Sequence, residues 1–437
     1  MQFIHRTLNH AIATNRVFPV SDHENAKDKM LNWAQQFNIF CLLDNHRYNN
    51  YPHTFECMLA AGCVDSFRAD AGNAIEELQQ YINNKNSWLF GHLGYDLKNE
   101  IEELSSSHPD RIQFSDLFFF EPQFLIRLNE DETTIQGSSN PEKIFASIIN
   151  TRSTVSSSES NIHIQQRIHK EKYFDTITQL KKHIQRGDCY EINFCQEFFA
   201  EDVSLDPVSV YKKLSSVSPN PFSALYKLHN KFLVCASPER FLYKRGKKII
   251  SQPMKGTSKR VLADKAEDSF SKYALYESAK DRSENAMVVD VVRNDLSKLC
   301  KEGKVKVDEL YGIYSFPQVH QMISTISGEL KDDVSFADII RATFPMGSMT
   351  GAPKKRVMEL IEKYEATKRG IYSGALGYIT PSGDFDFNVV IRSMMYNKAD
   401  KYLSFQAGSG ITHYSDPGNE WEECLLKAKA INNVLTS

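Results

Sequence analysis

The sequence predicts an α+β fold in which large antiparallel sheets pack against each other and helices lie outside. The chain has 437 residues, of which 41% are hydrophobic and 24% are charged, and this is enough to bury a large core. Apolar runs that predict strands come in neighbouring pairs and do not alternate strictly with helical patterns. That order favours antiparallel sheets over a doubly wound parallel sheet.

Composition excludes several classes of protein. The net charge is −3, so there is no bulk basic character to indicate a nucleic-acid or membrane partner. No apolar run is long enough to span a bilayer, and Met1–Val17 has no signal-type apolar stretch. The eight cysteines are scattered without a Cys-x-x-Cys pair, which favours free thiols in a reducing cytoplasm over disulfides or structural zinc.

The first 150 residues contain both strand-like and helix-like segments. Phe37–Leu43 is an apolar run of buried-strand type, and Asp70–Ile82 has the pattern of an amphipathic helix. Trp88–Asp96 predicts a strand whose small residues allow close packing, and Asp96–Leu104 predicts a short acidic helix.

A boundary is predicted after this region. Thr151–Ser160 contains seven Ser or Thr in ten residues, which is a linker composition. We therefore expect an N-terminal region over 1–150 and a second domain over 165–437, although the same stretch would also suit a surface loop within one domain.

The second region predicts further helices and strands. Lys170–Gln185 predicts a helix that ends at Gly187, and Tyr190–Phe199 a strand. Two arms around His229 and Asn230 predict a hairpin, with strands over Phe222–Leu228 and Phe232–Ala236. The remaining predicted elements are a long helix over Ala274–Leu299, strands over Gln318–Leu330, Gly374–Thr380 and Asp386–Met395, a glycine-rich turn at Gly408–Gly410 and a final helix from Asn419.

The stretch Arg341–Glu365 predicts a helix whose start suits an anion. Val357, Leu360, Ile361 and Tyr364 form one apolar stripe. Before them, Thr350 is expected to cap the helix and Pro353 to occupy its first turn, while Gly347 and Gly351 allow tight turns and Lys354 and Lys355 add positive charge. The P-loop spacing is absent, and an ordinary capped helix is the alternative.

Two helices carry paired carboxylates. Asp281 and Glu284 are three residues apart, with Glu277 one turn earlier, and Glu420 and Glu423 are also three apart. Such groups suit Mg²⁺, which is often held by one or two carboxylates together with water. Solvated helix faces are the alternative, but the apolar run from Asn285 is unlike an exposed helix.

Three further residues are candidates for chemistry. Lys255 lies in the turn Gln252–Ser258 and would be a nucleophile if its pKa fell toward about 7–8. Glu239 in Ser237–Phe241 is a candidate acid. Arg392 in the apolar run Asn388–Ser393 needs an anionic partner, such as a substrate carboxylate. The alternatives are a surface lysine, a surface Arg–Glu contact, and pairing of Arg392 with one of the chain's own carboxylates.

Together these motifs resemble one family, the chorismate-utilising enzymes, whose members include anthranilate synthase component I. The resemblance covers about residues 165–437 in the family's order, with a looser likeness at Trp88–Glu100. The resembling segments are Gly187–Asn193, Ser237–Phe241, Pro253–Thr257, Glu284–Asp295, Phe344–Lys354, Gly374–Tyr378, Ile391–Arg392, Ala407–Gly410 and Glu420–Glu423.

The resemblance implies a fold, a substrate and a reaction. The fold would be the chorismate-binding fold of anthranilate synthase component I, with a catalytic domain over 165–437 and a regulatory pocket possible in 1–150. Lysine at position 255 resembles the members that make 4-amino-4-deoxychorismate, the precursor of 4-aminobenzoate and folate, because anthranilate synthases typically have alanine there. Lys255 would add to C2 of chorismate, with Glu239 as general acid for loss of the C4 hydroxyl, and ammonia would then add at C4.

The resemblance also implies ligands for the site. Glu284 and Glu423 match the family's Mg²⁺ ligands. Asp281 and Glu420 would contact the ion through water or support the two direct ligands. Residues expected to bind substrate are Gly256, Thr257, Thr350, Tyr372, Arg392, Gly408, Ser409 and Gly410.

One position departs from the family pattern. Many relatives have histidine where this chain has Gln321, and in anthranilate synthases that histidine is associated with loss of pyruvate. Gln321 fits a product that keeps its enolpyruvyl group, although the adjacent His320 could replace the histidine after a small register shift.

The resemblance implies a source of nitrogen as well. No cysteine in a glycine-rich elbow is present, so ammonia is expected from a separate glutamine amidotransferase subunit. The alternative activities are those of anthranilate synthase component I and then isochorismate synthase, and the non-enzymatic alternative is a regulatory protein that binds an aromatic metabolite.

Overall fold

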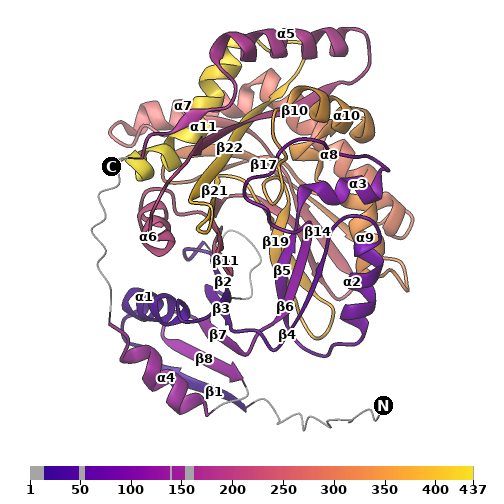
Figure 1. The fold of residues 1–437 in the computed structure, drawn as a ribbon. Coiled ribbons are helices and arrows are strands. Elements are labelled where there is room, and N and C mark those ends of the chain that lie inside the picture. The colour runs from indigo at the N-terminus through magenta and orange to yellow at the C-terminus, as the bar shows by residue number, and fades with distance from the viewer. Residues whose placement is uncertain (1–13, 49–54, 138–139, 153–161, 437) are drawn as a thin grey trace.

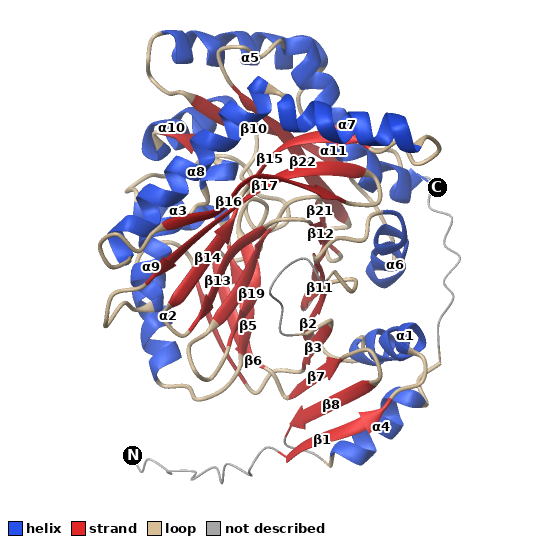
Figure 2. Ribbon diagram, turned by 180° about the vertical axis from the view of Figure 1, so that it is seen from behind, coloured by secondary structure: helices blue, strands red, loops and turns tan. Residues whose placement is uncertain are grey.

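Two large antiparallel sheets face each other, and helices cover their outer sides (Figures 1 and 2). The computed structural model describes residues 14–48, 55–137, 140–152 and 162–436. The predicted linker Thr151–Ser160 therefore lies mostly outside the described residues. The predicted α+β class with antiparallel sheets is confirmed.

One sheet has twelve strands within the described residues, and β9 (Gln165–Gln166) joins it through β10. The other strands follow in spatial order: β1 (Thr14–Pro19), β8 (Glu132–Gly137), β7 (Phe124–Leu128), β3 (Cys57–Ala61), β2 (Ile39–Asp44), β11 (Phe222–Leu228), β12 (Lys231–Ser237), β21 (Ser393–Asn397), β22 (Tyr402–Ile411), β10 (Glu191–Ala200) and β18 (Gly351–Ala352).

The other sheet has ten strands within the same residues, and β16 (Lys306–Ser315) joins it through β17. The remaining strands follow in spatial order: β15 (Met254–Lys259), β17 (Val319–Glu329), β14 (Lys248–Gln252), β13 (Arg240–Arg245), β20 (Phe385–Val389), β19 (Ala375–Ile379), β5 (Leu89–Leu93), β6 (Leu117–Glu121) and β4 (Asp65–Ala69).

The helices pack on the outer faces of both sheets. Helix α8 packs beside β15 and β17, and α9 packs against α8 and α2, whereas α11 lies along β22 and contacts α5 and α6. The helices are α1 (His23–Ala34), α2 (Ala74–Asn83), α3 (Lys98–Ile101), α4 (Pro141–Ile149), α5 (Lys170–Gln185), α6 (Pro207–Val217), α7 (Lys265–Glu277), α8 (Ala279–Leu299), α9 (Phe336–Thr343), α10 (Lys354–Tyr364) and α11 (Pro417–Thr436), with short 3₁₀ turns η1 (Tyr95–Leu97) and η2 (Gly347–Met349).

Strand alternation divides the core into two layers. In β2, Ile39 and Cys41 join the cluster between the sheets, while Phe40 and Leu42 join the cluster under the helices. All four are buried, because successive side chains of a strand point to opposite faces and both faces here are covered. This explains why the run Phe37–Leu43 is apolar without interruption.

The N-terminal residues complete both sheets. β2 pairs with β11, and β5 pairs with β19, so strands from 14–137 and from 165–411 share each sheet. Between the sheets, Leu43, Asp44 and Asn45 line a small cavity of about 70 Å³ with Tyr378. Whether a regulatory ligand binds there stays a prediction.

Most predicted elements are confirmed within a few residues. The predicted helix over Lys170–Gln185 is α5, and Gly187 follows it with a φ of 82°. The hairpin is β11 and β12, and His229 in its turn has a φ of 55°. The predicted strand Trp88–Asp96 is β5, where a Cβ on Gly91 would lie 2.0 Å from the Phe118 carbonyl oxygen, so a glycine is required.

The predicted long helix over Ala274–Leu299 is wrong, because the chain forms two helices there. Ser278 has extended dihedral angles, ends α7 and caps α8 by accepting a hydrogen bond from the Asp281 amide. Glu277 is therefore the last residue of α7 and does not share a helix face with Asp281 and Glu284. A serine cap inside a continuous helical pattern was the missed signal.

The predicted strand Asp386–Met395 is also two strands, and they belong to different sheets. β20 ends at Val389 and β21 begins at Ser393, so the chain crosses between the sheets at Val390–Arg392. Arg392 has a φ of 51° and lies in this crossing, not in a strand. Because both strands are largely buried, the sequence is apolar across the crossing and shows no boundary between them.

Two details of the glycine-rich segments differ from expectation. Gly408–Gly410 is not a turn but part of β22, where a Cβ on Gly408 would lie 1.9 Å from the Phe194 carbonyl oxygen of β10. Pro353, not Thr350, is the N-cap of α10, since the Thr350 hydroxyl donates to the Met346 carbonyl instead. The buried stripe of Val357, Leu360 and Ile361 is confirmed.

Candidate active site

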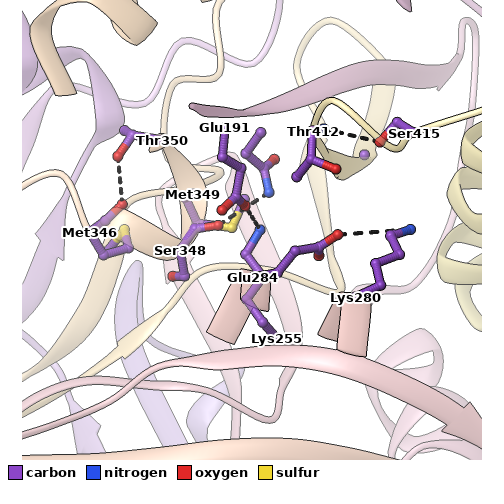
Figure 3. Close-up of polar contacts among 12 residues, drawn as sticks. Glu191, Lys255, Lys280, Glu284, Met346, Ser348, Met349, Thr350, Thr412 and Ser415 are labelled. Carbon is purple, nitrogen blue, oxygen red and sulfur yellow. Dashed lines mark hydrogen bonds and ion pairs between the residues drawn. The ribbon is translucent and has the colours of Figure 1, made fainter. Parts of the chain in front are cut away.

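The predicted site residues gather where β15 of one sheet approaches β10 and β22 of the other. Figure 3 shows Lys255 and Glu191 pointing toward each other, with Glu284 beside them. Lys255 comes from β15, Glu191 is the first residue of β10, and Glu284 lies on α8. A Cβ on Gly410 of β22 would lie 2.6 Å from Lys255 Nζ, so this glycine makes room for the amine.

Lys255 is buried and surrounded by acids. Its side chain is 9% exposed, and Nζ forms an ion pair with Glu191 Oε1. Burial alone would lower the pKa of Lys255, but the charges of Glu191, Glu284 and Glu423 outweigh it and raise that pKa. The surface-lysine alternative is therefore wrong, and these surroundings do not meet the condition set for a nucleophile, a pKa lowered toward about 7–8.

Glu239 is a buried carboxylic acid. It follows β12, is 3% exposed, and accepts a hydrogen bond of 2.6 Å from the Ser348 hydroxyl. Burial raises the pKa of Glu239 to about 7, against the hydrogen bond from Ser348 and the charge of Lys255. A group with this pKa exchanges a proton readily near neutral pH. The surface Arg–Glu alternative is wrong, since Arg240 pairs with Asp386 instead.

Two of the predicted metal ligands have unsatisfied oxygens. Glu284 is 8% exposed and Glu420 is 1% exposed, and one carboxylate oxygen of each is buried without a hydrogen bond. Burial raises the pKa of Glu284 to about 7, with Glu191 adding to the effect and Lys255 and Lys280 opposing it. Unsatisfied buried carboxylate oxygens from two neighbouring helices fit a hard cation that keeps its waters.

Lys280 occupies the space between these two acids. Its Nζ lies 3.8 Å from Glu284 Oε1 and 3.5 Å from Glu420 Oε1 (Figure 3 shows the Glu284 contact). The other two predicted ligands are arranged differently: Glu423 pairs with Lys427 at 2.7 Å, and Asp281 lies against Gly256. Among the described residues, no three acids, histidines or cysteines form a ready-made metal-binding group.

Arg392 has no acidic partner of its own. Within the described parts of the chain, no carboxylate lies within 4.0 Å of its guanidinium. The alternative that Arg392 pairs with one of the chain's own carboxylates is therefore wrong as far as the described residues are concerned. A guanidinium that is partly buried and unpaired is costly, and an incoming carboxylate removes that cost.

The remaining predicted substrate residues lie around this space. Tyr372 is buried with its hydroxyl 3.9 Å from Cys195 Sγ. Gly256 has a φ of 91°, and a Cβ there would lie 2.9 Å from that of Asp281. Thr350 is fully buried with its hydroxyl already bonded to Met346. Ser409 is fully buried between Gly408 and Gly410 in β22.

The register of β17 decides between Gln321 and His320. Gln321 lies opposite Thr257 of β15 and accepts a 3.1 Å hydrogen bond from its hydroxyl. His320 points to the other face, where its ring nitrogens bond Asp268 and Ser315. Because neighbouring residues of a strand face opposite sides, His320 does not replace the family's histidine.

An open groove leads to these residues. It has a volume of about 610 Å³, runs between β15 and α7, and its lining includes Thr257, Ser278 and Asp281. Two of the predicted site residues, Thr257 and Asp281, therefore border an open groove.

Sequence reasoning did not single out four residues that contact predicted site residues or the segments around them: Glu191, Lys280, Ser348 and Arg369. Glu191 and Ser348 lie inside motifs already recognised, but no spacing links them to Lys255 or Glu239. Arg369 is buried, pairs with Glu365, and donates to the carbonyls of Asn193 and Met349, which ties β10 to the turn η2. Such contacts depend on tertiary structure alone.

Comparisons with known proteins agree with this arrangement. A family model described as chorismate binding enzyme matches residues 44–433. An anthranilate synthase component I-like protein of Synechocystis is 31% identical, over 82% of this chain and 74% of its own. Aminodeoxychorismate synthase component 1 of Klebsiella aerogenes is 32% identical, over 79% of this chain and 77% of its own.

A solved structure shows the same fold. The crystal structure of anthranilate synthase component I from Streptococcus pneumoniae superposes with a TM-score of 0.76 at 24% identity, over 88% of this chain and 93% of its own. In the part of the chain that the structure describes, no helix is both long and apolar enough to span a membrane.

Proposed function

Since this chain belongs to the chorismate binding enzyme family, we propose that it aminates chorismate at C4 to give 4-amino-4-deoxychorismate, through a covalent adduct on Lys255. The observation that carries the proposal is the buried Lys255 amine, which points into a site that also holds a buried acid, Glu239. The name of the Klebsiella relative supports the same reaction.

The reaction would divide one displacement into two steps. The Lys255 amine adds to C2 of the ring, the ring double bonds shift, and the C4 hydroxyl leaves as water with a proton from Glu239. Ammonia then adds at C4, the double bonds return, and the bond between C2 and the lysine nitrogen breaks. The pKa of Glu239 near 7 supports its role as the acid, because it holds a proton at neutral pH and releases it easily.

Opposite ends of the site would hold the two carboxylates of chorismate. Arg392, which has no acidic partner among the described residues, would bind the enolpyruvyl carboxylate bidentately beside Tyr372. At the other end, Glu284 and Glu423 with Asp281 and Glu420 would hold Mg²⁺, which supplies positive charge for the ring carboxylate when bound. Neutralising Glu284 and Glu423 would also remove two of the three charges that raise the pKa of Lys255.

The nitrogen would come from a partner. We propose a separate glutamine amidotransferase subunit as the donor, because the name of the Klebsiella relative, component 1, implies a second component. Ammonium salts would replace that subunit in a purified system. Folate or 4-aminobenzoate synthesis is the pathway that this product serves.

Anthranilate synthesis is the second candidate, favoured by the name of the Synechocystis relative. Gln321 counts against it, because the residue that faces Thr257 in β17 is not a histidine. The two reactions differ in their products, since only anthranilate synthesis releases pyruvate.

A product assay tests the proposal. Purified protein with chorismate, Mg²⁺ and an ammonium salt is expected to form 4-amino-4-deoxychorismate, measured by liquid chromatography and mass spectrometry. Lys255→Met should abolish this product, whereas Lys259→Met, an exposed lysine on the same strand, should not. Anthranilate with pyruvate as the only products would contradict the proposal.

A further inference from the structure

Glu191 is the acidic group in direct contact with the amine that is proposed to react. Its side chain is 2% exposed, and Oε1 forms the ion pair with Lys255 Nζ. The other oxygen, Oε2, is buried without a hydrogen-bond partner. A Cβ on Gly410 would lie 2.7 Å from Glu191 Oε1 and 2.6 Å from Lys255 Nζ, so the glycine leaves just enough room for both groups.

The backbone fixes Glu191 firmly. It begins β10, lies opposite Ala352 of β18, and its carbonyl oxygen passes within 2.1 Å of where a Cβ on Gly351 would be. The next residues of β10 pair with β22 from Ile192 onward. Glu191 therefore lies on a strand that is paired with β18 on one side and β22 on the other, and its carboxylate is not a flexible surface group.

We propose that Glu191 is the base that takes the proton from Lys255 before the amine attacks chorismate. The inference rests on the proposed function, because only a reacting lysine needs such a base. An ammonium group has no free electron pair, so Lys255 must lose a proton before it can bond to carbon.

Other acids of the site are less suited to this step. No carboxylate besides that of Glu191 lies within 4.0 Å of Lys255 Nζ among the described residues. Glu239 is bonded to Ser348 and is needed in its protonated form for the leaving hydroxyl. Glu284 faces Lys280, and Glu423 faces Lys427. The contact with Lys255 therefore singles out Glu191.

The proton balance of the step is simple. One N–H bond of the Lys255 ammonium breaks and one O–H bond forms on Glu191, so an ion pair becomes a neutral amine beside a neutral acid. The amine's electron pair then forms the bond to C2. When that bond breaks after ammonia has added, the lysine leaves as a neutral amine and regains its proton from Glu191.

A purely structural ion pair predicts the opposite result for the same variant. If Glu191 only held the amine in place, its charge would stabilise the ammonium form and slow the reaction. Glu191→Gln would then leave the rate unchanged or raise it, because removing the charge makes deprotonation easier. If Glu191 is the base, the same variant loses the proton acceptor and slows.

The experiment compares wild type, Glu191→Gln and Glu191→Asp in the ammonium-dependent assay. We expect Glu191→Gln to lower kcat by about 100-fold or more, with the KM for chorismate changed by less than about threefold. Below about pH 7, where Glu239 keeps its proton, the rate of this variant should rise about tenfold per pH unit, because solvent must now take the proton from Lys255. Glu191→Asp should recover part of the rate.

Controls separate this inference from the proposed function. Thermal unfolding and Mg²⁺ titration show whether each variant is folded and binds metal. A Glu191→Gln rate at or above that of an active wild type overturns the role of Glu191 and leaves the amination intact. Full amination by Lys255→Met overturns the covalent mechanism, and the Glu191 step with it.

Discussion

The two ends of the candidate site differ in the sign of the charge that lacks a partner. Around Lys255, three acids raise the pKa of one amine, and Glu284 and Glu420 each keep an oxygen without a hydrogen bond. Around Arg392, a guanidinium has no acidic partner among the described residues. The acids around Lys255 would be neutralised by a cation, and the guanidinium of Arg392 by an anion. This is expected if Mg²⁺ and a dicarboxylate complete the site together.

A second arginine shows what a structural pair looks like in the same molecule. Arg240 is 1% exposed, and two of its nitrogens donate to Asp386 at 2.9 and 3.0 Å, while a third donates to Gln252. Arg392 lies where the chain crosses from β20 to β21, and among the described residues it has no such partner. The difference fits a structural role for Arg240 and the proposed ligand-binding role for Arg392.

The largest effect is expected for Glu239→Gln, which removes the proposed acid. The kcat should fall about 100-fold or more. In wild type, kcat should decline as the pH rises above about 7, because Glu239 must carry a proton and burial raises its pKa to about 7. Steady-state rates across pH test this. Ser348→Ala, which removes the bond that lowers this pKa, should move the decline to higher pH. An unchanged rate in Glu239→Gln would remove it from the mechanism.

Arg392→Gln and Arg240→Gln should separate binding from folding. Arg392→Gln should raise the KM for chorismate about 10- to 100-fold, because it removes the binding free energy of a charged, hydrogen-bonded pair. It should cause little loss of stability. Arg240→Gln should instead lower the free energy of unfolding by about 3–5 kcal/mol, because it breaks the ion pair between the buried Arg240 side chain and Asp386. Kinetics and urea unfolding measure the two. Equal loss of stability in both variants would contradict the comparison.

Glu284→Gln should change how the stability of the metal-free protein depends on pH. Burial raises the pKa of Glu284 from 4.5 to about 7, so the folded state holds its proton more tightly than the unfolded state. Wild type should therefore lose stability as the pH rises from about 4.5 through about 7, and the variant should lose less, by about 3 kcal/mol at pH 8. Urea unfolding with a chelator measures this. Glu422→Gln, an exposed acid on α11, should resemble wild type.

The smallest effect is expected for Lys280→Met. Lys280 lies between Glu284 and Glu420, where it would compete with a bound cation. Its side chain is 43% exposed, so the competition is screened, and Mg²⁺ affinity should rise only about three- to tenfold. Isothermal titration calorimetry measures the affinity. Weaker Mg²⁺ binding by the variant would mean that Lys280 supports the metal site.

The sequence was informative where local patterns decide the structure. α5 and the hairpin of β11 and β12 follow from periodicity and turn residues, and motifs were enough to single out Lys255, Glu239 and Glu284 as candidates. It failed at two boundaries. Ser278 ends one helix and caps the next, with a helical pattern on both sides of it. Val390–Arg392 carries the chain from one sheet to the other without a break in the apolar pattern.

Electrostatics could not be predicted either. The pKa of Lys255 is raised, not lowered, because Glu191 arrives from another strand more than sixty residues earlier in the chain, in the other sheet. Neither the spacing nor the composition of a segment shows which charges will face it. The absence of a partner at Arg392 likewise becomes visible only when every neighbouring element is in place.

The covalent role of Lys255 can be measured directly by mass spectrometry of the protein after mixing with chorismate and Mg²⁺ in the absence of ammonia. The account predicts an added mass of one chorismate less one water, located on the peptide that contains Lys255, absent from Lys255→Met and lost when ammonium is added. Turnover to 4-amino-4-deoxychorismate by Lys255→Met at the wild-type rate, or an adduct on another residue, would contradict it.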